Sequence, residues 1–470
     1  MENLEKKMAN AGIQDDEHML SPVPMSERRP TWRQVLVWVG FGYVVTGLFV
    51  GGVLAGFGGQ PGLPPQSAAL SIALGMGFLF IMTSFLGIMA QDTGMSLAII
   101  SRYSYGMKGA SIPMVVMALL TLGWFASITG MVGDIWGSFI GNPSGITVFD
   151  PANFGYSNIP VITLEVFLSC VLAGAIFTWA AYRGIKTIEN MAIPVAPIIL
   201  FIALWVGFGM LSEGGGLNAF LSEAGSREGL GLGSGITVVI GSWIAGAMMG
   251  VDLFRFNKTR LAVFWGAAAC FIFTNPLLNA VGYIGSISVG QFNYVEWMIG
   301  KSLLLAVIGV FAWTASLWTT NNAELYCNSL YTGPVLASLS KLVERKKLVL
   351  IAGVLGTILG SLAFYQIFFA DFINVLGAGA TPVVGPLLAD YYFIKKRNYN
   401  VDKYTEQPEY RLAGVISFFV GAISGIVLEY VFEIGFSTGV LALLISIVVY
   451  VIVYNLTGDV DFDRKQEAAV

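Results

Sequence analysis

The chain has 470 residues, of which 56% are hydrophobic and only 11% are charged, and its mean hydropathy is +0.73. A soluble globular domain carries about 25% charged residues, so this chain lacks the polar side chains needed to cover itself in water. Its net charge of −4 offers no basic face to a polyanion, which excludes nucleic acid as an expected partner. The composition predicts an integral membrane protein whose surroundings are the lipid bilayer.

The sequence has few of the residues that catalytic or metal sites use. The one histidine, His18, lies in a polar N-terminal segment, and Cys170, Cys270 and Cys327 lie far apart without metal-binding or redox spacing. We therefore expect no enzyme activity and three small, buried thiols. Residues 1–32 are charged and contain no apolar core, so we expect no cleaved signal peptide.

Twelve apolar runs are long enough to cross a membrane, because a spanning helix needs about 20 such residues. Helix is required in lipid, where a lone strand leaves its backbone unsatisfied, and the runs lack the alternation of a membrane β-barrel. The predicted fold is all-α. The expected spans are 33–57, 67–91, 111–138, 161–182, 189–212, 233–252, 262–287, 297–322, 347–369, 372–393, 411–430 and 436–456.

The basic residues predict the orientation. All but two of the 25, Arg227 and Lys301, fall in the tails or in alternate connections between spans. Because basic residues mark the cytoplasmic side, we expect a multi-pass protein of the cell membrane with the tails 1–32 and 457–470 in the cytoplasm. The segment 323–346 carries apolar residues at helical spacing and predicts an amphipathic cytoplasmic helix.

Glycines gather in the first and sixth spans. Many secondary transporters contain two inverted repeats whose first helix is broken at mid-membrane, and a break needs residues that tolerate a non-helical backbone. Close helix packing also uses glycine, so the pattern alone leaves both interpretations open. The glycines are Gly40, Gly42, Gly47, Gly51 and Gly52 in span one and Gly233, Gly235, Gly241, Gly246 and Gly250 in span six.

The eighth span contains the strongest polar signal, five polar side chains within residues 316–322. Such side chains are costly in hydrocarbon unless they face a cavity, an ion or each other, although serine and threonine can also bond to their own helix. Threonine hydroxyls and freed backbone carbonyls together suit Na⁺, whereas a divalent ion would want carboxylates. Glu324 lies just beyond this segment.

Two tryptophans, Trp124 and Trp243, fall at the middle of spans three and six. Most tryptophans of membrane proteins lie at the interface, so two at mid-depth suggest a flat ligand stacked between indoles. Packing in the protein core is the alternative.

Several sequence blocks then recur in a fixed order, and on them the chain resembles the nucleobase–cation symporter-1 family, particularly its cytosine-permease branch. The resemblance runs from about Arg33 to Arg397. The blocks are Thr83-Ser84-Phe85-Leu86-Gly87, Ser101-Arg102-Tyr103-Ser104-Tyr105-Gly106, Gly123-Trp124-Phe125, Gly241-Ser242-Trp243, Asp252-Leu253-Phe254-Arg255, Trp318-Thr319-Thr320-Asn321 and Ala389-Asp390-Tyr391-Tyr392.

The resemblance implies two inverted five-helix repeats, 33–212 and 233–393, followed by two additional helices in 411–456. It implies alternating access and import of a planar heterocycle together with a cation. It also implies a ligand sandwiched by Trp124 and Trp243. The sodium ligands that it implies are the side chains of Thr319 and Thr320 and backbone carbonyls near Gly40, Tyr43 and Ser316.

The chain departs from the cytosine-permease pattern at three pocket positions. Thr121 stands where a glutamine is typical, Ser316 replaces an asparagine, and Ala245 replaces a serine. Two amides that would pair with a base edge are absent, so cytosine itself is not assured. We predict a Na⁺-coupled importer of a nucleobase-like heterocycle held by Trp124, Trp243, Ser242, Gly241, Thr121, Ser316, Asn321 and Ala245.

Other possibilities stay open at this point. The same scaffold would suit a guanidinium, amine or amino-acid-like solute, or coupling to protons. The roles of Asp134, Glu165 and Glu324 are undecided, as is the oligomeric state, although we expect a monomer to function. Asp252 with Arg255, and Asp92 with Arg102, would form either structural ion pairs or an inside gate.

Overall fold

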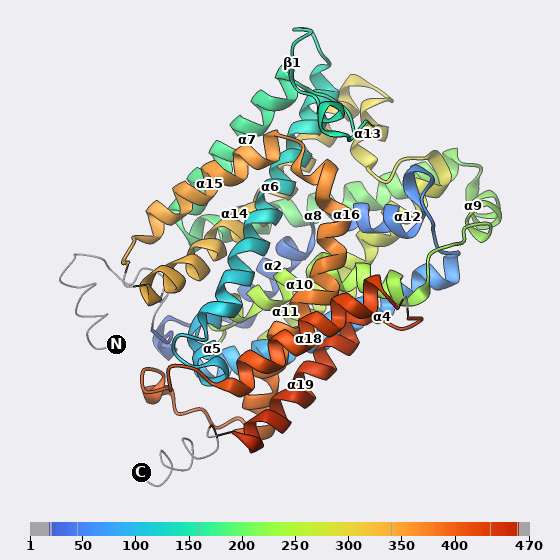
Figure 1. Cartoon of the computed structure of the whole chain (residues 1–470). Helices are drawn as coiled ribbons and strands as arrows, with labels where there is room; N and C mark the ends of the chain where they lie inside the picture. The colour runs from blue at the N-terminus through green and yellow to red at the C-terminus, as the bar shows by residue number, and fades with distance from the viewer. Residues whose placement is uncertain are drawn as a thin grey trace.

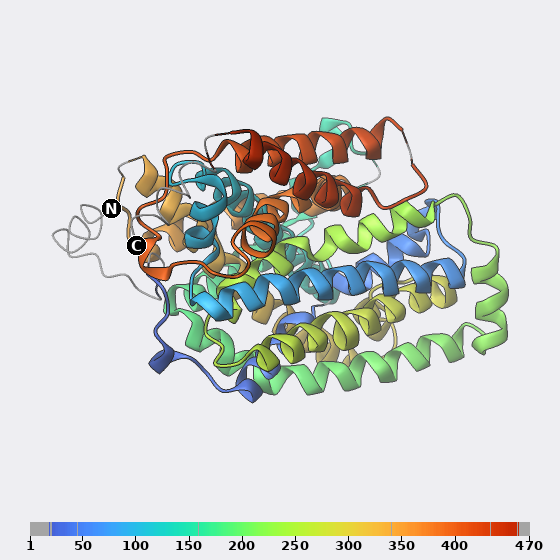
Figure 2. The same ribbon diagram turned by 90° about the horizontal axis from the view of Figure 1, so that it is seen from below.

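The structure is a computed structural model and is almost entirely helical (Figures 1 and 2). It describes residues 18, 21–44, 46–157, 159–339, 341–432, 434–457 and 459, without the side chains of 58, 185–196 and 369–370. Most of the two predicted tails lies outside the described residues. A short hairpin of β1 (Thr147–Phe149) and β2 (Ile162–Thr163) is the one sheet in the described part of the chain. The predicted all-α membrane fold is confirmed.

The first half of the chain forms helices that are joined by short connections. Their bounds are α2 (Thr31–Gly42), α3 (Thr46–Leu54), α4 (Pro65–Thr93), α5 (Leu97–Tyr105), α6 (Ser111–Ile140), α7 (Leu164–Arg183), α8 (Ile185–Glu213) and α9 (Gly216–Gly225). The helices α8 and α9 meet at 81°, and Figure 2 shows α9 turned across the end of the longer helix.

The second half also consists of helices joined by short connections, and it ends in a pair of long helices. Its α-helices are α10 (Leu232–Phe254), α11 (Arg260–Ala268), α12 (Asn275–Val289), α13 (Tyr294–Ile299), α14 (Leu303–Ser338), α15 (Arg345–Ser361), α16 (Phe364–Val375), α17 (Val384–Leu388), α18 (Leu412–Tyr430) and α19 (Thr438–Leu456). The π-helical turn η5 (Ala269–Thr274) joins the two pieces of the seventh span. In the tenth span the π-helical turn η6 (Leu376–Ala380) and the 3-10 turn η7 (Thr381–Val383) join α16 to α17, and the π-helical turn η8 (Ala389–Ile394) follows α17.

Among the described residues, nine helices are long and apolar enough to cross a membrane, and two bent pairs raise that number to 11. Each of the twelve predicted ranges is occupied by helix, but the count of twelve spans remains a prediction. The ninth predicted range ends too late. Helix α15 stops at Ser361, and the chain turns at Ala363, whose φ is +61°, before α16 begins.

The predicted amphipathic helix at 323–346 is wrong. Helix α14 continues without a break from Leu303 to Ser338, and its residues from Ala323 to Tyr331 are buried. The apolar spacing in this segment therefore belongs to the buried C-terminal part of a 36-residue helix that contacts α6 and α15. Only the short stretch between α14 and α15 is a loop.

Of the two interpretations of the glycines, a break applies to the first span and close packing applies to the sixth. Helices α2 and α3 are bent by 51° around Tyr43 and Val44. Helix α10, in contrast, is continuous, and its glycines serve packing. A Cβ added to Gly241 would lie 2.1 Å from the carbonyl oxygen of Ile373 in α16. Glycine is required there because the two backbones touch.

Packing between the two halves is reciprocal. Helix α3 of the first half contacts α12 of the second, and in the same way α10 of the second half contacts α4 of the first. Helix α7 contacts α14 and α15 contacts α6, while α6 and α14 contact each other. Two related halves with exchanged partners would produce these pairs, which supports the inverted repeat. The repeat boundaries 33–212 and 233–393 remain predictions. Helices α18 and α19 lie together along one side (Figure 2).

The contact between α3 and α12 generates a test of backbone packing. A Cβ added to Gly282 would lie 2.0 Å from the carbonyl oxygen of Leu48, an atom that cannot rotate away. We expect Gly282→Ala to lower the free energy of unfolding by about 1–3 kcal/mol, the usual range for overpacking.

The measurement is the thermal unfolding midpoint of the purified protein in detergent. Gly77→Ala is the matched control, because an added Cβ there has no neighbour within 4 Å. Equal midpoints for the two variants would contradict this description of the α3–α12 contact.

Candidate transport site

The break between α2 and α3 lies directly against α14. The hydroxyl of Ser316 donates a hydrogen bond of 2.8 Å to the carbonyl oxygen of Tyr43, the residue that follows α2. Asn275 in α12 donates from Nδ2 to the carbonyl of Gly42 at 3.3 Å. Carbonyls that a broken helix leaves free inside a membrane protein need such partners, so the break is held by side chains of two neighbouring helices.

Three neutral oxygens of α14 gather beside this break. Thr319 Oγ1 donates to the carbonyl of Ser316 at 2.7 Å, and Thr320 Oγ1 is buried without a hydrogen-bond partner among the described residues. Ser316, Thr319 and Thr320 are at most 4% exposed, and Gly40 is buried in the last turns of α2. The described residues contain no cluster of three His, Cys, Asp or Glu side chains. Uncharged oxygens of this kind fit a monovalent cation better than a divalent one.

The two mid-span indoles are buried at the same depth of the bundle. Trp124 in α6 is 4% exposed and lies edge-on to Phe372, with ring centroids 5.7 Å apart. The next residue, Ile373, touches Gly241, two residues before Trp243 of α10. One turn of α16 therefore contacts α6 beside the first indole and α10 beside the second. Trp243 is 5% exposed and meets the edges of Phe41 and Phe271.

Around Trp243, the polar groups predicted to hold a ligand are mostly engaged within the protein. Ser242 Oγ donates to the carbonyl of Val239 at 2.7 Å, and Ala245 presents a buried methyl group. Gly241 serves the contact with α16 described above. The indole Nε1 of Trp243, however, is buried and has no hydrogen-bond partner among the described residues. It is a donor available to a ligand.

Helix α14 is tied to α6 by two asparagines. Asn321 Nδ2 donates to the carbonyl of Phe125 at 3.3 Å and to Thr129 Oγ1 at 3.1 Å. Asn328 Nδ2 donates to Thr121 Oγ1 at 3.0 Å, and that hydroxyl donates in turn to its own helix. Thr121 is thus fixed within the protein, whereas Asn321 Oδ1 keeps a free acceptor among the described residues. That these residues bind a ligand remains a prediction.

The undecided carboxylates near the hairpin end lie in different settings. Asp134 accepts hydrogen bonds from Tyr365 and from Gln366, the latter at 2.7 Å, and lines a cavity of about 30 Å³ together with Glu296. Burial raises the pKa of Glu296 in the short helix α13, and the neighbouring charge of Asp134 raises it further. Glu165 lies apart from them and accepts from the backbone N–H of Ser144 at 2.9 Å.

Asp252, at the other end of α10, is bonded within the protein. Its carboxylate accepts from the backbone N–H of Leu97 at 3.2 Å and from the hydroxyl of Tyr331 at 3.0 Å. Arg255 Nε donates to the backbone carbonyl of Asp252 at 3.2 Å. Asp252 therefore ties α10 to α5 and α14 at this end of the bundle.

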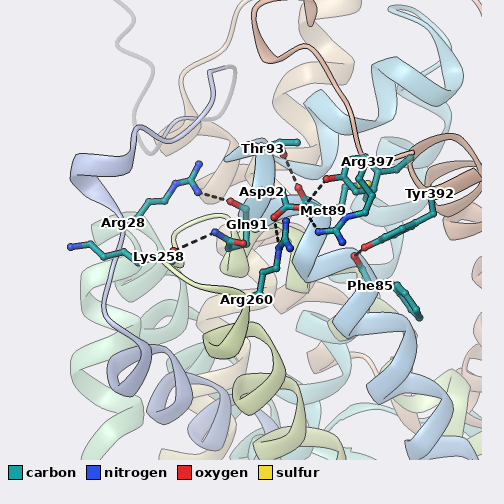
Figure 3. Close-up of polar contacts among 11 residues, drawn as sticks. Arg28, Phe85, Met89, Gln91, Asp92, Thr93, Lys258, Arg260, Tyr392 and Arg397 are labelled. Atoms are coloured by element: carbon teal, nitrogen blue, oxygen red, sulfur yellow. Dashed lines mark hydrogen bonds and ion pairs between the residues drawn. The ribbon is translucent and has the colours of Figure 1, made fainter. Parts of the chain in front are cut away.

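Asp92, near the end of α4, is the centre of a second network, drawn in Figure 3. Its two carboxylate oxygens accept from Arg260 Nε and from an Arg397 guanidinium nitrogen, each at 2.8 Å, and Tyr391 adds a third hydrogen bond at 3.0 Å. The hydrogen bond to Asp92 raises the pKa of Arg397. Next to it, Arg28 donates to the carbonyl of Gln91, which joins the N-terminal segment to the same end of α4.

The family of the chain follows from its similarity to known proteins. The chain matches the family of permeases for cytosine/purines, uracil, thiamine and allantoin over residues 22–454. It belongs to this family, the nucleobase–cation symporter-1 transporters. The permease is therefore a multi-pass membrane transporter of the nucleobase type.

Its curated relatives are distant but cover most of the chain. Cytosine permease of Escherichia coli K12 is 24% identical over 412 residues, covering 88% of this chain and 89% of the relative. Hydantoin permease of Microbacterium maritypicum is 23% identical over 373 residues, 75% and 70% of the two chains. Allantoin permease of Bacillus subtilis is 24% identical over 450 residues, 87% and 86% of the two chains.

Solved structures show the same fold. Mhp1, a nucleobase-cation-symport-1 family transporter in a closed conformation with bromovinylhydantoin bound, superposes with a TM-score of 0.73 at 20% identity, covering 94% of this chain and 96% of its own. A Na⁺-coupled sialic acid symporter superposes with a TM-score of 0.64 at 11% identity, over 95% and 92% of the two chains.

Parts of these arrangements could not be predicted from the sequence of the permease. The predicted pair of Asp92 with Arg102 is wrong, because Asp92 bonds Arg260 and Arg397, which are far away in sequence. The contact of Phe372 with Trp124 was not predicted, because an apolar residue in an apolar span carries no local signal.

The Asp92 network generates a prediction of stability. Its carboxylate is 17% exposed and accepts two charge-assisted hydrogen bonds. We expect Asp92→Asn to lower the free energy of unfolding by about 1.5–3 kcal/mol, the scale of hydrogen bonds to charged groups. Thermal unfolding in detergent is the measurement, and Glu223→Gln, which removes an exposed pair with Arg227, is the control. A midpoint as little changed as that of the control would show the network to be weak.

Proposed function

We propose that this permease imports a small planar nucleobase or nucleobase-like heterocycle together with Na⁺ by alternating access. The observation that carries the proposal is the contact between Ser316 and the Tyr43 carbonyl, beside the unpartnered hydroxyl of Thr320. It brings the break of the first span and the polar face of α14 to one place, where freed carbonyls and hydroxyls can surround an ion.

Sodium is the ion that this donor set favours. The candidate ligands Thr319, Thr320, Ser316, Tyr43 and Gly40 supply hydroxyl and carbonyl oxygens and no formal charge, so the ion's own charge is the only one in the shell. A bound Na⁺ would fasten α14 to the break between α2 and α3. Fixing these helices would shape the adjacent ligand site, and by linkage the ligand and the ion would then each raise the affinity of the other by the same factor.

A flat ligand suits the region beside Trp124 and Trp243. Cytosine, hydantoin and allantoin, named in the permeases similar to this chain, are heterocycles with N–H and carbonyl groups. The two indoles offer apolar faces to such a ring. Trp243 Nε1 and Asn321 Oδ1 offer one donor and one acceptor that the described residues leave free. We propose that the ligand stacks on these indoles and takes those two bonds, with Ser242 and Ser316 nearby.

Alternating access requires the two ends of the bundle to open in turn. The positive-inside pattern assigns the end that carries Asp92, Arg260 and Arg397 to the cytoplasm of the cell membrane. The network at that end would hold α4, α11 and the segment after η8 together until the transporter opens inward. All the groups in this scheme come from one chain, so a monomer would suffice.

The ion assignment predicts the effect of removing one hydroxyl. Thr320→Val keeps the shape of the side chain but removes its oxygen, so we expect the apparent Na⁺ affinity to fall at least tenfold, roughly 1.4 kcal/mol. The measurement is radiolabelled uptake of cytosine, uracil, hydantoin and allantoin into proteoliposomes as the sodium concentration varies.

Thr357→Val is the matched control, since Thr357 in α15 bonds only to its own helix among the hydrogen bonds of the described residues. Uptake that ignores sodium and follows a proton gradient would overturn the sodium assignment and establish proton coupling.

The stacking assignment predicts a loss of ligand affinity. Trp243→Ala removes one indole face, and we expect it to weaken binding of whichever heterocycle is transported by about 1–3 kcal/mol, the scale of stacking between a base and an aromatic ring. Equilibrium binding to the purified protein is the measurement. Trp205→Ala, which removes a 47% exposed indole of α8, is the control. An unchanged dissociation constant for Trp243→Ala would exclude the sandwich.

A further inference from the structure

Glu324 of α14 is a buried carboxyl group that the proposed scheme does not yet use. It is 4% exposed and stands one helical turn after Thr320. Its Oε2 has no hydrogen-bond partner among the described residues, and no described Lys, Arg or His forms an ion pair with it. An ionisable side chain at such a depth in a membrane protein marks a functional site, and its partner has to be found.

The contacts of α14 show which way Glu324 points. Successive residues of an α-helix are about 100° apart, so Glu324 lies about 60° from Asn321 and about 20° from Tyr331 around the helix axis. Asn321 faces α6, where it bonds the Phe125 carbonyl, and Tyr331 faces α10, where it bonds Asp252. Glu324 therefore faces the space between α6 and α10, the two helices that carry the indoles.

The same contacts fix its depth. Asn321 and Asn328 bond the carbonyls of Phe125 and Ala118, so α6 runs antiparallel to α14 and Glu324 lies beside the turn that holds Thr121. Tyr331, two turns further along α14, bonds Asp252 near the end of α10. Two residues of α6 are about 3 Å along the axis, which places Glu324 within one turn of the level of Trp124.

Among the described residues, no Lys, Arg or His forms an ion pair with Glu324, and the nearby hydroxyl groups are already bonded within the protein. The hydroxyl of Thr121 donates to the Met117 carbonyl and accepts from Asn328, and Ala245 presents a methyl group. Ser242 donates to its own helix. A buried carboxylate without a partner is unfavourable by several kcal/mol and has to take a proton, a cation or a set of N–H donors.

We infer that Glu324 is the anionic pole of the substrate site, and that the substrate carries a positively charged amidinium or guanidinium edge on its planar ring. A carboxylate accepts two parallel N–H bonds from such an edge, and the two indoles stabilise the same cation through their faces. This inference rests on the proposed function and narrows its ligand from heterocycles in general to cationic ones.

The test compares two ligands that differ in charge but hardly in shape. 2-Aminoimidazole is a guanidinium-type cation near neutral pH, and 2-imidazolone replaces its exocyclic nitrogen with a carbonyl oxygen. Binding of each to the full-length protein in detergent is measured by calorimetry at constant sodium. We expect the wild type to prefer the cation at least tenfold, and Glu324→Gln to reduce that preference at least tenfold while leaving 2-imidazolone within about threefold.

Two variants keep the result interpretable. Glu324→Asp retains the charge and should retain a preference for the cation, which a loss of folding would not. Glu429→Gln changes a carboxyl group that bonds Thr438 in the α18–α19 pair and should leave both affinities unchanged.

The remaining outcomes overturn the inference. If wild type and Glu324→Gln bind 2-imidazolone equally well and neither prefers the cation, Glu324 is not the anionic pole, while the proposed transport of planar heterocycles stands. If Glu324→Gln weakens both ligands alike and abolishes proton uptake on binding, the carboxyl group is a proton site. If the wild type binds neither ligand, and Trp243→Ala changes the binding of no heterocycle, the proposed function fails as well.

Discussion

Every backbone group inside a bilayer needs a partner, and this requirement governs the centre of the molecule. An intact helix meets it alone, whereas the break at Tyr43 and Val44 exposes carbonyls that other elements have to satisfy. Asn275 serves the Gly42 carbonyl and Ser316 serves the Tyr43 carbonyl. The break can therefore exist only where α12 and α14 present polar side chains. An ion coordinated by the same carbonyls would hold α14 against the break between α2 and α3.

The glycines show how a second requirement, close backbone contact, can be met by the same residue type. In α2 and α3 the glycines flank a break, and Gly51 also lets α3 touch α12. In α10 they leave the helix intact and let α16 approach at Gly241. The sequence could not distinguish these uses, because a glycine reports only that a side chain is absent. The distinction depends on which helix packs against the glycine, and the residues of that helix lie more than a hundred positions away in the sequence.

What the sequence predicted well follows from local physics. The apolar runs depend on neighbouring residues, and the structure confirms the helical fold that they predict. Trp124 and Trp243 are buried, while their part in binding a ligand stays a prediction. The length of α14 was missed because a buried helix and an amphipathic surface helix share one apolar spacing. The early end of α15 was missed because the apolar sequence continues through the turn at Ala363 into α16. The partners of Asp92 were missed because three separate segments converge on it. The hydrogen bonds of the candidate ligands could not be predicted, because their partners are far away in the sequence.

Helix α14 also explains how one small site could hold two positive charges. Thr320 and Glu324 are one turn apart, which is about 6 Å along the helix. A Na⁺ and a substrate cation held about 6 Å apart would repel by about 3 kcal/mol at an effective dielectric constant of about 20, enough to weaken either ligand about a hundredfold. A carboxylate within the same distance of both attracts each by a similar amount. Glu324 would thus offset the repulsion between Na⁺ and a cationic substrate, and the neutral oxygens around Thr320 would leave that balance undisturbed. Uncharged oxygens for the ion and one carboxylate for the substrate are thus the arrangement along α14 that would let both cations bind.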